Sequence, residues 1–230
     1  MKKAILIFLL FSVKVSSAQD STFVRDMPRD AFIFNFSYIF WQNAPEDVEL
    51  KPVPLEFDFY TMLPLFGIDN TFSGAAGLGI SCSNNRLNAL PATDEANITY
   101  FDADTLTVYD YKVNKLSVVY IDIPLELRLR STPKENKKCF KLALGFKAGY
   151  MISNYHKYKG EDFRAASDDK VKFKEYNRPN LLSYRYGVYV RFGYSDLNLA
   201  GYYSLSPVFK EDKGPDIMPF SAGLCVTLNL

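Results

Sequence analysis

The chain has 230 residues, of which 27 are Lys or Arg and 26 are Asp or Glu. A formal net charge of +1 removes the electrostatic basis for nucleic-acid binding. The 48% hydrophobic and 23% charged content excludes a disordered chain, and a mean hydropathy of −0.11 excludes a bundle of membrane helices. The unusual feature is the aromatic content, with 19 Phe and 16 Tyr against a single Trp.

Residues 1–18 have the pattern of a cleavable secretory signal peptide. Lys2 and Lys3 give a positively charged start, a short apolar run follows, and small residues precede a cut before Gln19. The apolar run is well short of the roughly 20 residues that a membrane-spanning helix needs. The sequence therefore predicts an exported protein whose mature part, 19–230, is a single domain. A buried first strand is the alternative interpretation of the run.

The rest of the chain alternates between two kinds of residue with the period of a β-strand. One set of alternate positions carries large apolar side chains, and the other carries small or polar ones. We expect strands over eight ranges, near 31–41, 55–60, 75–82, 119–130, 140–149, 184–193, 197–205 and 220–230. No comparable stretch of the sequence has helical periodicity, so the chain is predicted to be all-β.

The small-residue face distinguishes a membrane barrel from a soluble one. In a soluble sandwich or lipocalin-like barrel that face would meet water and be rich in Lys, Glu and Thr. Here it is rich in Gly and Ala with single charges between them, which suits the crowded interior of a narrow barrel. The apolar face is nearly free of charge, as lipid contact requires. We therefore expect an eight-stranded antiparallel up-and-down transmembrane β-barrel with a plugged polar lumen; a soluble β-protein is the alternative.

Charged residues on the inward positions are predicted to fill the lumen. They are Glu56, Asp58, Asp122, Glu126, Arg128, Lys141, Lys147, Arg185 and Arg191, with Arg130 at the rim. A charge in a low-dielectric lumen is costly unless it is paired, so we expect salt bridges that plug the barrel. A gated ion path or a small-ligand site is the functional alternative, although eight strands leave an interior just wide enough for side chains.

The spacing of the strands also predicts the two ends of the barrel. With both termini periplasmic, short turns are expected near 62–71, 131–138 and 194–196, and longer outer loops near 43–52, 84–115, 154–181 and 207–217. We interpret the charges of the third outer loop as a solvated surface, with a ligand-facing surface as the alternative. Pro124 lies inside a strand and lacks a backbone N–H, so it predicts a local irregularity of the ladder.

Several short motifs resemble a known family. Residues 120–127, YIDIPLEL, resemble the Y-[LI]-[ED]-I-P-L strand of the PorT-like outer-membrane β-barrels, which are abundant in Bacteroidetes. Residues 144–150, LGFKAGY, are similar to that family's glycine-rich next strand, and residues 72–79 and 220–224 agree with it. The resemblance covers most of residues 31–230 and implies an eight-stranded outer-membrane barrel. The family's namesake is tied to the type IX secretion and gliding machinery, and most members have no assigned activity.

Patterns typical of catalysis or metal binding are scarce in the sequence. His156 is the only histidine, and we interpret it as a rim residue among interfacial tyrosines. Its alternative role is that of an active-site histidine in a membrane protease, phospholipase or acyltransferase. The three cysteines have neither CxxC nor metal-ligand spacing, and phosphate-loop, dinucleotide-binding and HExxH motifs are missing from the sequence. No disulfide, metal or cofactor is expected.

Together these patterns predict a non-enzymatic outer-membrane β-barrel of the Gram-negative envelope with a structural, scaffold or loop-display role. The resemblance adds a possible link to a secretion machinery. The expected partners are outer-membrane lipid and envelope or secretion-complex proteins, and not nucleic acid. The alternatives are a narrow channel or small-ligand-binding barrel and, third, a membrane enzyme that uses His156.

Overall fold

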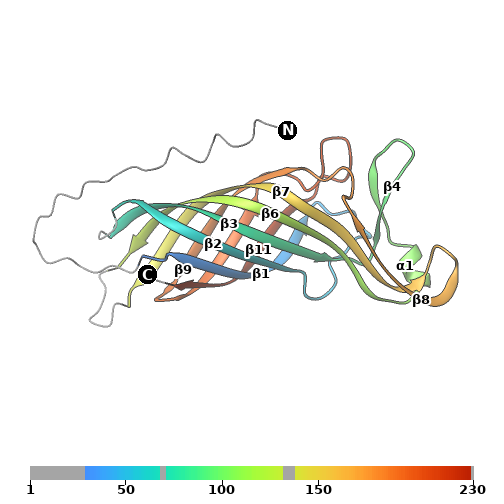
Figure 1. Ribbon diagram of the computed structural model, residues 1–230, viewed down its shortest axis with the longest axis horizontal. Helices are drawn as coiled ribbons and strands as arrows, with labels where there is room; N and C mark the ends of the chain where they lie inside the picture. The colour runs from blue at the N-terminus through green and yellow to red at the C-terminus, as the bar shows by residue number, and fades with distance from the viewer. Residues whose placement is uncertain (1–28, 68–70, 132–137, 229–230) are drawn as a thin grey trace, which may run out of the picture.

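Eight strands close into one antiparallel barrel in the computed structural model, which describes residues 29–67, 71–131 and 138–228 (Figure 1). The strands are β1 (Phe32–Gln42), β2 (Leu55–Phe66), β3 (Phe72–Arg86), β6 (Tyr111–Arg130), β7 (Phe140–Asp162), β9 (Tyr184–Tyr194), β10 (Leu197–Ser204) and β11 (Met218–Leu228). Each strand pairs with its neighbour along the chain, and β1 pairs with β11 to close the ring. The predicted eight-stranded up-and-down barrel is confirmed. The predicted signal peptide lies outside the described residues.

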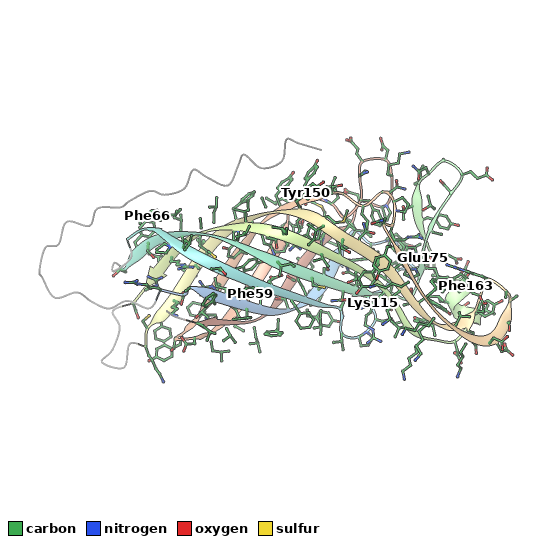
Figure 2. All side chains as sticks on the ribbon, in the orientation of Figure 1. Phe59, Phe66, Lys115, Tyr150, Phe163 and Glu175 are labelled. Carbon is green, nitrogen blue, oxygen red and sulfur yellow. The ribbon has the colours of Figure 1, made fainter. Side chains whose placement is uncertain are left out.

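Side chains of the barrel alternate between its two surfaces as the sequence predicts. On β6, Ile123 and Leu127 are 55% and 51% exposed on the outer surface, whereas Asp122 and Glu126 are 0% and 3% exposed inside. Figure 2 shows side chains projecting outward along the barrel, and Phe59 is one of those labelled. An exposed band of this kind is the surface that transmembrane barrels present to lipid.

The barrel end opposite the short turns differs from the sequence prediction. We expected irregular loops over 84–115 and 154–181, but β6 begins at Tyr111 and β7 ends only at Asp162. Three further strands lie here, with a single helical turn: β4 (Leu90–Thr93) pairs with β5 (Thr99–Asp102), β8 (Ser167–Tyr176) pairs with β7, and α1 spans Thr105–Val108. The prediction was wrong because the alternation in these segments places apolar residues inside and polar ones outside, the reverse of the barrel pattern.

These segments form an outer lobe, which we define as residues 43–54, 87–118, 153–183 and 205–217. A strand of about 9–11 residues crosses a membrane, whereas β6 has 20 residues and β7 has 23. Both strands therefore continue from the barrel into the lobe, as Figure 1 shows. The lobe has an apolar core in which Leu87, Leu116 and Ile217 are at most 1% exposed, and a smaller cluster surrounds Tyr158.

A β-bulge marks the passage of β7 from the barrel into the lobe. The register of β6 with β7 shifts between Val119↔Ser153 and Tyr120↔Met151, which leaves Ile152 as an extra residue. Before the bulge, odd-numbered residues of β7 point inward; after it, even-numbered ones do.

Two prolines disturb the ladder. The pairing of β3 with β6 skips Gly77 and Leu78, which lie opposite the stretch containing Pro124, and the register is unchanged on either side. This confirms the predicted irregularity at Pro124, whose nitrogen has no hydrogen to donate. A register shift of β2 against β3 lies between Pro64 and Phe66. Because β2 continues past that proline to Phe66, it occupies part of the range 62–71 that was predicted as the first turn.

No helix in the described part of the chain is long and apolar enough to cross a membrane.

Candidate functional site

The nine charged residues predicted for the lumen all lie inside the barrel, and each is at most 9% exposed. They form two groups. The middle cluster comprises Glu56, Asp58, Asp122, Lys147 and Arg185, and the turn-side cluster comprises Glu126, Arg128, Lys141 and Arg191. Arg130, predicted at the rim, is 4% exposed at the same end as the turn-side cluster.

Arg185 organises the middle cluster. Its Nη1 lies 2.7 Å from Glu56 Oε1, and its Nη2 lies 2.8 Å from Asp122 Oδ2. Lys147 Nζ lies 3.7 Å from Asp58 Oδ2 and donates a hydrogen bond of 3.0 Å to the hydroxyl of Tyr60. Three carboxylates therefore share two cations in a space closed to solvent, where each ion needs its partner.

The turn-side cluster contains an acid, Asp30, that strand alternation did not predict. Asp30 is 1% exposed, and its carboxylate lies 2.5 Å from Lys141 Nζ and 3.3 Å from Arg191 Nη1. Glu126 accepts from Arg128 Nε at 2.6 Å and from Arg191 Nη2 at 3.1 Å. With this residue the two clusters hold five acids and five bases, so their formal charges balance.

Strand alternation could not have revealed Asp30. The residue precedes β1, and its even number matches the lipid-facing positions of that strand. Its backbone has a φ of 42°, in the left-handed region that Asp tolerates better than most residues. The alternation that applies along the strand therefore does not extend to this residue. An acid next to the end of a predicted barrel strand was the only available indication.

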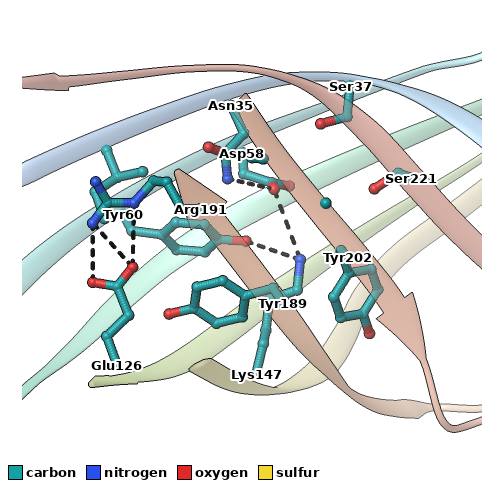
Figure 3. Close-up of a pocket in the computed structure, with 13 residues that line it drawn as sticks. Asn35, Ser37, Asp58, Tyr60, Glu126, Lys147, Tyr189, Arg191, Tyr202 and Ser221 are labelled. Atoms are coloured by element: carbon teal, nitrogen blue, oxygen red, sulfur yellow. Dashed lines mark hydrogen bonds and ion pairs between the residues drawn. The ribbon is translucent and has the colours of Figure 1, made fainter. Parts of the chain in front are cut away.

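Side chains close the lumen. A cavity of about 30 Å³ lies between the Glu126–Arg191 pair and the Asp58–Lys147 pair (Figure 3). A second cavity of about 40 Å³ lies between Arg185 and the outer lobe. Each has room for one or two water molecules, as expected for a barrel of eight strands whose interior is just wide enough for side chains.

His156 lies within the outer lobe, so its interpretation as a rim residue was wrong. It is 3% exposed, its Nε2 lies 2.6 Å from Asn114 Oδ1, and its Nδ1 lies 3.9 Å from Glu175 Oε2. The bulge at Ile152 turns the ring inward, where an uninterrupted strand would place it outside. Burial, reinforced by the positive charge of Arg178, lowers the pKa of His156 to about 4. The imidazole is therefore neutral near pH 7.

Glu175 lies beside His156 on the inner face of β8. Burial opposes its charge, but the hydrogen bond and charge of Arg164 and the charge of Arg178 outweigh this and lower the pKa of the carboxyl. The nitrogen Arg178 Nη1 lies 3.0 Å from the carboxylate. Glu175 thus forms ion pairs with Arg164 and Arg178, and the ring of His156 lies between Asn114 and Glu175.

Comparison with known families agrees with the geometry. A family model described as an outer membrane protein beta-barrel domain matches residues 65–210. The chain belongs to this outer-membrane β-barrel family. The matched range extends from the end of β2 past β10 and includes the lobe segments 87–118 and 153–183. No curated protein and no solved structure matches the chain.

The family assignment supports an outer-membrane location and contact of the apolar band with lipid. Outer-membrane barrels have short periplasmic turns and longer loops at the cell surface. Here residues 195–196 join β9 to β10 at one end, and the lobe lies at the other. This arrangement is consistent with the predicted orientation, in which the outer lobe lies toward the cell exterior and the turn-side cluster toward the periplasm.

Among residues 29–67, 71–131 and 138–228, no group of three or more His, Cys, Asp or Glu side chains is placed to hold a metal ion. Cys82, Cys139 and Cys225 are free thiols. The features of the barrel that need a functional explanation are therefore the closed lumen and the folded lobe.

Proposed function

We propose that this protein is a closed, non-enzymatic outer-membrane barrel that holds the outer lobe at the cell surface as a rigid binding platform. The observation that carries the proposal is the lobe's own buried core, built on two strands that continue directly from the barrel. A loop without such a core would lose its conformation on leaving the membrane, whereas a packed lobe presents a fixed surface.

Contacts between separate loops support the rigidity of the lobe. Phe101 lies between Trp41 and Phe209, with ring centroids 5.8 Å and 5.9 Å away. Asn114 Nδ2 donates to the carbonyl oxygens of Leu87 and Ala89 at 3.1 Å and 2.8 Å. Each of these contacts connects segments far apart in the sequence, so the loops cannot move independently.

The surface of the lobe offers contact residues for a protein partner. Val108 is 75% exposed and Tyr100 is 48% exposed, although both belong to segments packed on the lobe core. Exposed apolar and aromatic side chains on a fixed scaffold are typical of interaction sites. The resemblance of residues 120–127 to PorT-like barrels makes an envelope complex, such as a secretion machinery, the class of partner that we propose.

The alternatives receive less support from the geometry. A channel or ligand-binding lumen would need more space than two cavities of about 30 and 40 Å³. An enzyme based on His156 would need the imidazole to reach substrate, but this side chain is 3% exposed and its Nε2 is hydrogen-bonded to Asn114 Oδ1.

Photocrosslinking in intact cells tests the platform role. A photoreactive amino acid at Val108 should produce a discrete adduct with one envelope protein, as should one at Tyr100. The matched control is Leu127, which is 51% exposed on the lipid-facing surface and should yield no such protein adduct. Lobe positions that form no protein adducts, or the same adducts as Leu127, would contradict the proposal.

Planar-bilayer recording tests the closed lumen. The refolded protein should produce no current steps. The double variant Glu126→Ala/Arg191→Ala, which removes the central pair of the turn-side cluster, shows whether the measurement detects an opened lumen. Steady ion conductance by the unmodified protein would refute the closed barrel and favour the narrow-channel alternative.

A further inference from the structure

Cations cover the outward face of the sheet where β3, β6, β7 and β8 rise above the barrel. One row crosses four strands through the cross-strand pairs Arg86↔Lys115, Lys115↔Lys157 and Lys157↔Lys174. The next row contains the pair Lys159↔Lys172. We call these six residues, Arg86, Lys115, Lys157, Lys159, Lys172 and Lys174, the basic face.

Among the residues that the structure describes, the basic face has no acidic partners of its own. Like charges directly opposite each other on neighbouring strands destabilise a sheet, and the basic face has four such pairs. Within the described part of the chain, none of its six cations forms an ion pair; the acids nearby are engaged elsewhere, as Glu175 is with Arg164 and Arg178. The folded chain thus carries an uncompensated positive charge on one fixed surface.

Two of the ammonium groups, those of Lys115 and Lys174, point toward the membrane. Lys174 Nζ lies 3.6 Å from the ring centroid of Tyr155 and 4.4 Å from that of Tyr176. Lys115 Nζ donates to Asn84 Oδ1 at 2.6 Å and lies 5.8 Å from the ring centroid of Tyr155. All three of these partners lie one row nearer the barrel than the lysines that contact them.

The row of Tyr155 and Tyr176 lies at the edge of the lipid-facing band. The exposed apolar residues Tyr150 and Ile152, at 64% and 50%, directly precede it on β7. Tyr155 lies three residues beyond Ile152, about 10 Å along a strand and about 7 Å in height at the usual barrel tilt. Lipid headgroups occupy this zone, in which tyrosines typically form a girdle and lysines extend to reach phosphate.

From this placement we infer that the basic face binds the phosphate groups of lipids in the outer leaflet, namely a phosphorylated glycolipid of the cell surface. Neighbouring strands are about 4.8 Å apart, so a row across four strands spans about 14 Å and can contact more than one phosphate. Lysine binds phosphate as a point charge without fixed geometry. The inference does not depend on the lobe having a protein partner.

Native mass spectrometry of the full chain in detergent tests the inference, with diphosphoryl lipid A as the probe and phosphatidylcholine as the comparison lipid. The unmodified protein should retain lipid A in preference to phosphatidylcholine. In the variant Lys157→Gln/Lys174→Gln, apparent affinity for lipid A should fall about tenfold or more, since each lysine near an anionic membrane surface contributes several-fold. The matched control Lys210→Gln/Lys213→Gln removes two lobe lysines that lie outside the basic face and should bind as the unmodified protein does.

Three results would overturn the inference: equal binding by the two double variants, equal retention of dephosphorylated lipid A, or complete displacement of lipid A by millimolar inorganic phosphate. The last would identify a site for free anions instead of lipid. Heat-modifiable migration on a gel confirms that each variant is folded. Both substituted lysines of the test variant are partly or fully exposed, so the barrel is expected to form normally.

Discussion

The barrel and the outer lobe share two strands, β6 and β7, but place apolar and charged residues on opposite faces of them. On β6 the inward positions carry Asp122 and Glu126 within the barrel, and Leu116 and Val118 within the lobe. The outward positions change from isoleucine and leucine to Lys115 over the same distance. The strand itself is continuous, so the change in residue type reflects what surrounds each region. Lipid surrounds the barrel, and water surrounds the lobe.

This comparison shows where charge is indispensable. A lumen cation is enclosed and holds buried carboxylates, so its removal leaves those carboxylates without compensation. A cation on the outward face of the lobe is hydrated and stands among like charges. The two regions should therefore respond very differently to the loss of one positive side chain.

The largest effect should come from Arg185→Ala. The change leaves Glu56 and Asp122 buried without their shared partner, and we expect the free energy of unfolding to fall by about 3 to 5 kcal/mol. Guanidinium unfolding in detergent micelles, followed by heat-modifiable migration, measures the loss. Lys159→Ala, on the outward face of the lobe, is the control and should change stability by less than about 0.5 kcal/mol. Similar losses in the two variants would remove the distinction between the regions.

The apolar core of the lobe should give the next largest effect. Leu116 is 1% exposed, and Leu116→Ala should cost about 2 to 4 kcal/mol in the stability of the lobe, because the side chain leaves a cavity. Leu127→Ala, on the same strand but 51% exposed toward lipid, creates no enclosed cavity and should cost about 1 kcal/mol. Amide hydrogen exchange separates the two regions: faster exchange in the lobe is expected only for the first variant. Uniform exchange in both variants would contradict a separately packed core.

A glycine in the barrel wall sharpens the comparison further. A Cβ on Gly149 would overlap Asp122 Oδ1, so Gly149→Ala must displace the carboxylate from Arg185. We expect a loss of about 1 to 3 kcal/mol from this overpacking. Gly201→Ala is the control, since its Cβ would meet nothing nearer than Val190 at 3.7 Å. Equal stability of the two variants in the same unfolding assay would contradict the tight packing of charges in the lumen.

Much of the barrel could be predicted because lipid imposes a strict alternation on each strand. Every acid and base predicted for the lumen lies at an inward position of a strand, and the alternation identifies those positions. Asp30 was missed because it precedes the first strand, where parity no longer applies. The strands of the lobe were not predicted because their outer face meets water. Their polar residues therefore point outward and their apolar residues inward, the reverse of the pattern that identified the barrel strands.

His156 shows a different limit. Its neighbours in sequence are tyrosines and lysines typical of a membrane rim, and nothing in that pattern indicates an extra residue at Ile152. The bulge depends on the pairing of β7 with β6, a long-range property that one strand's sequence does not contain. A shift of one residue moves every later side chain to the opposite face.

The smallest expected effect on stability belongs to His156. It can be measured directly, because His156 is the only histidine in the chain. Its pKa of about 4 lies below the value of about 6.5 expected in the unfolded chain. The folded lobe therefore favours the neutral ring, so its contribution to stability is complete above about pH 6.5 and is lost as the pH falls toward 4. The shift sets a ceiling of about 3 kcal/mol, and we expect about 1 kcal/mol, since the lobe can open before the barrel unfolds. An NMR titration of the single imidazole should give a midpoint near pH 4. A midpoint near 6.5 would place the ring in solvent and restore the rim position that the bulge excludes.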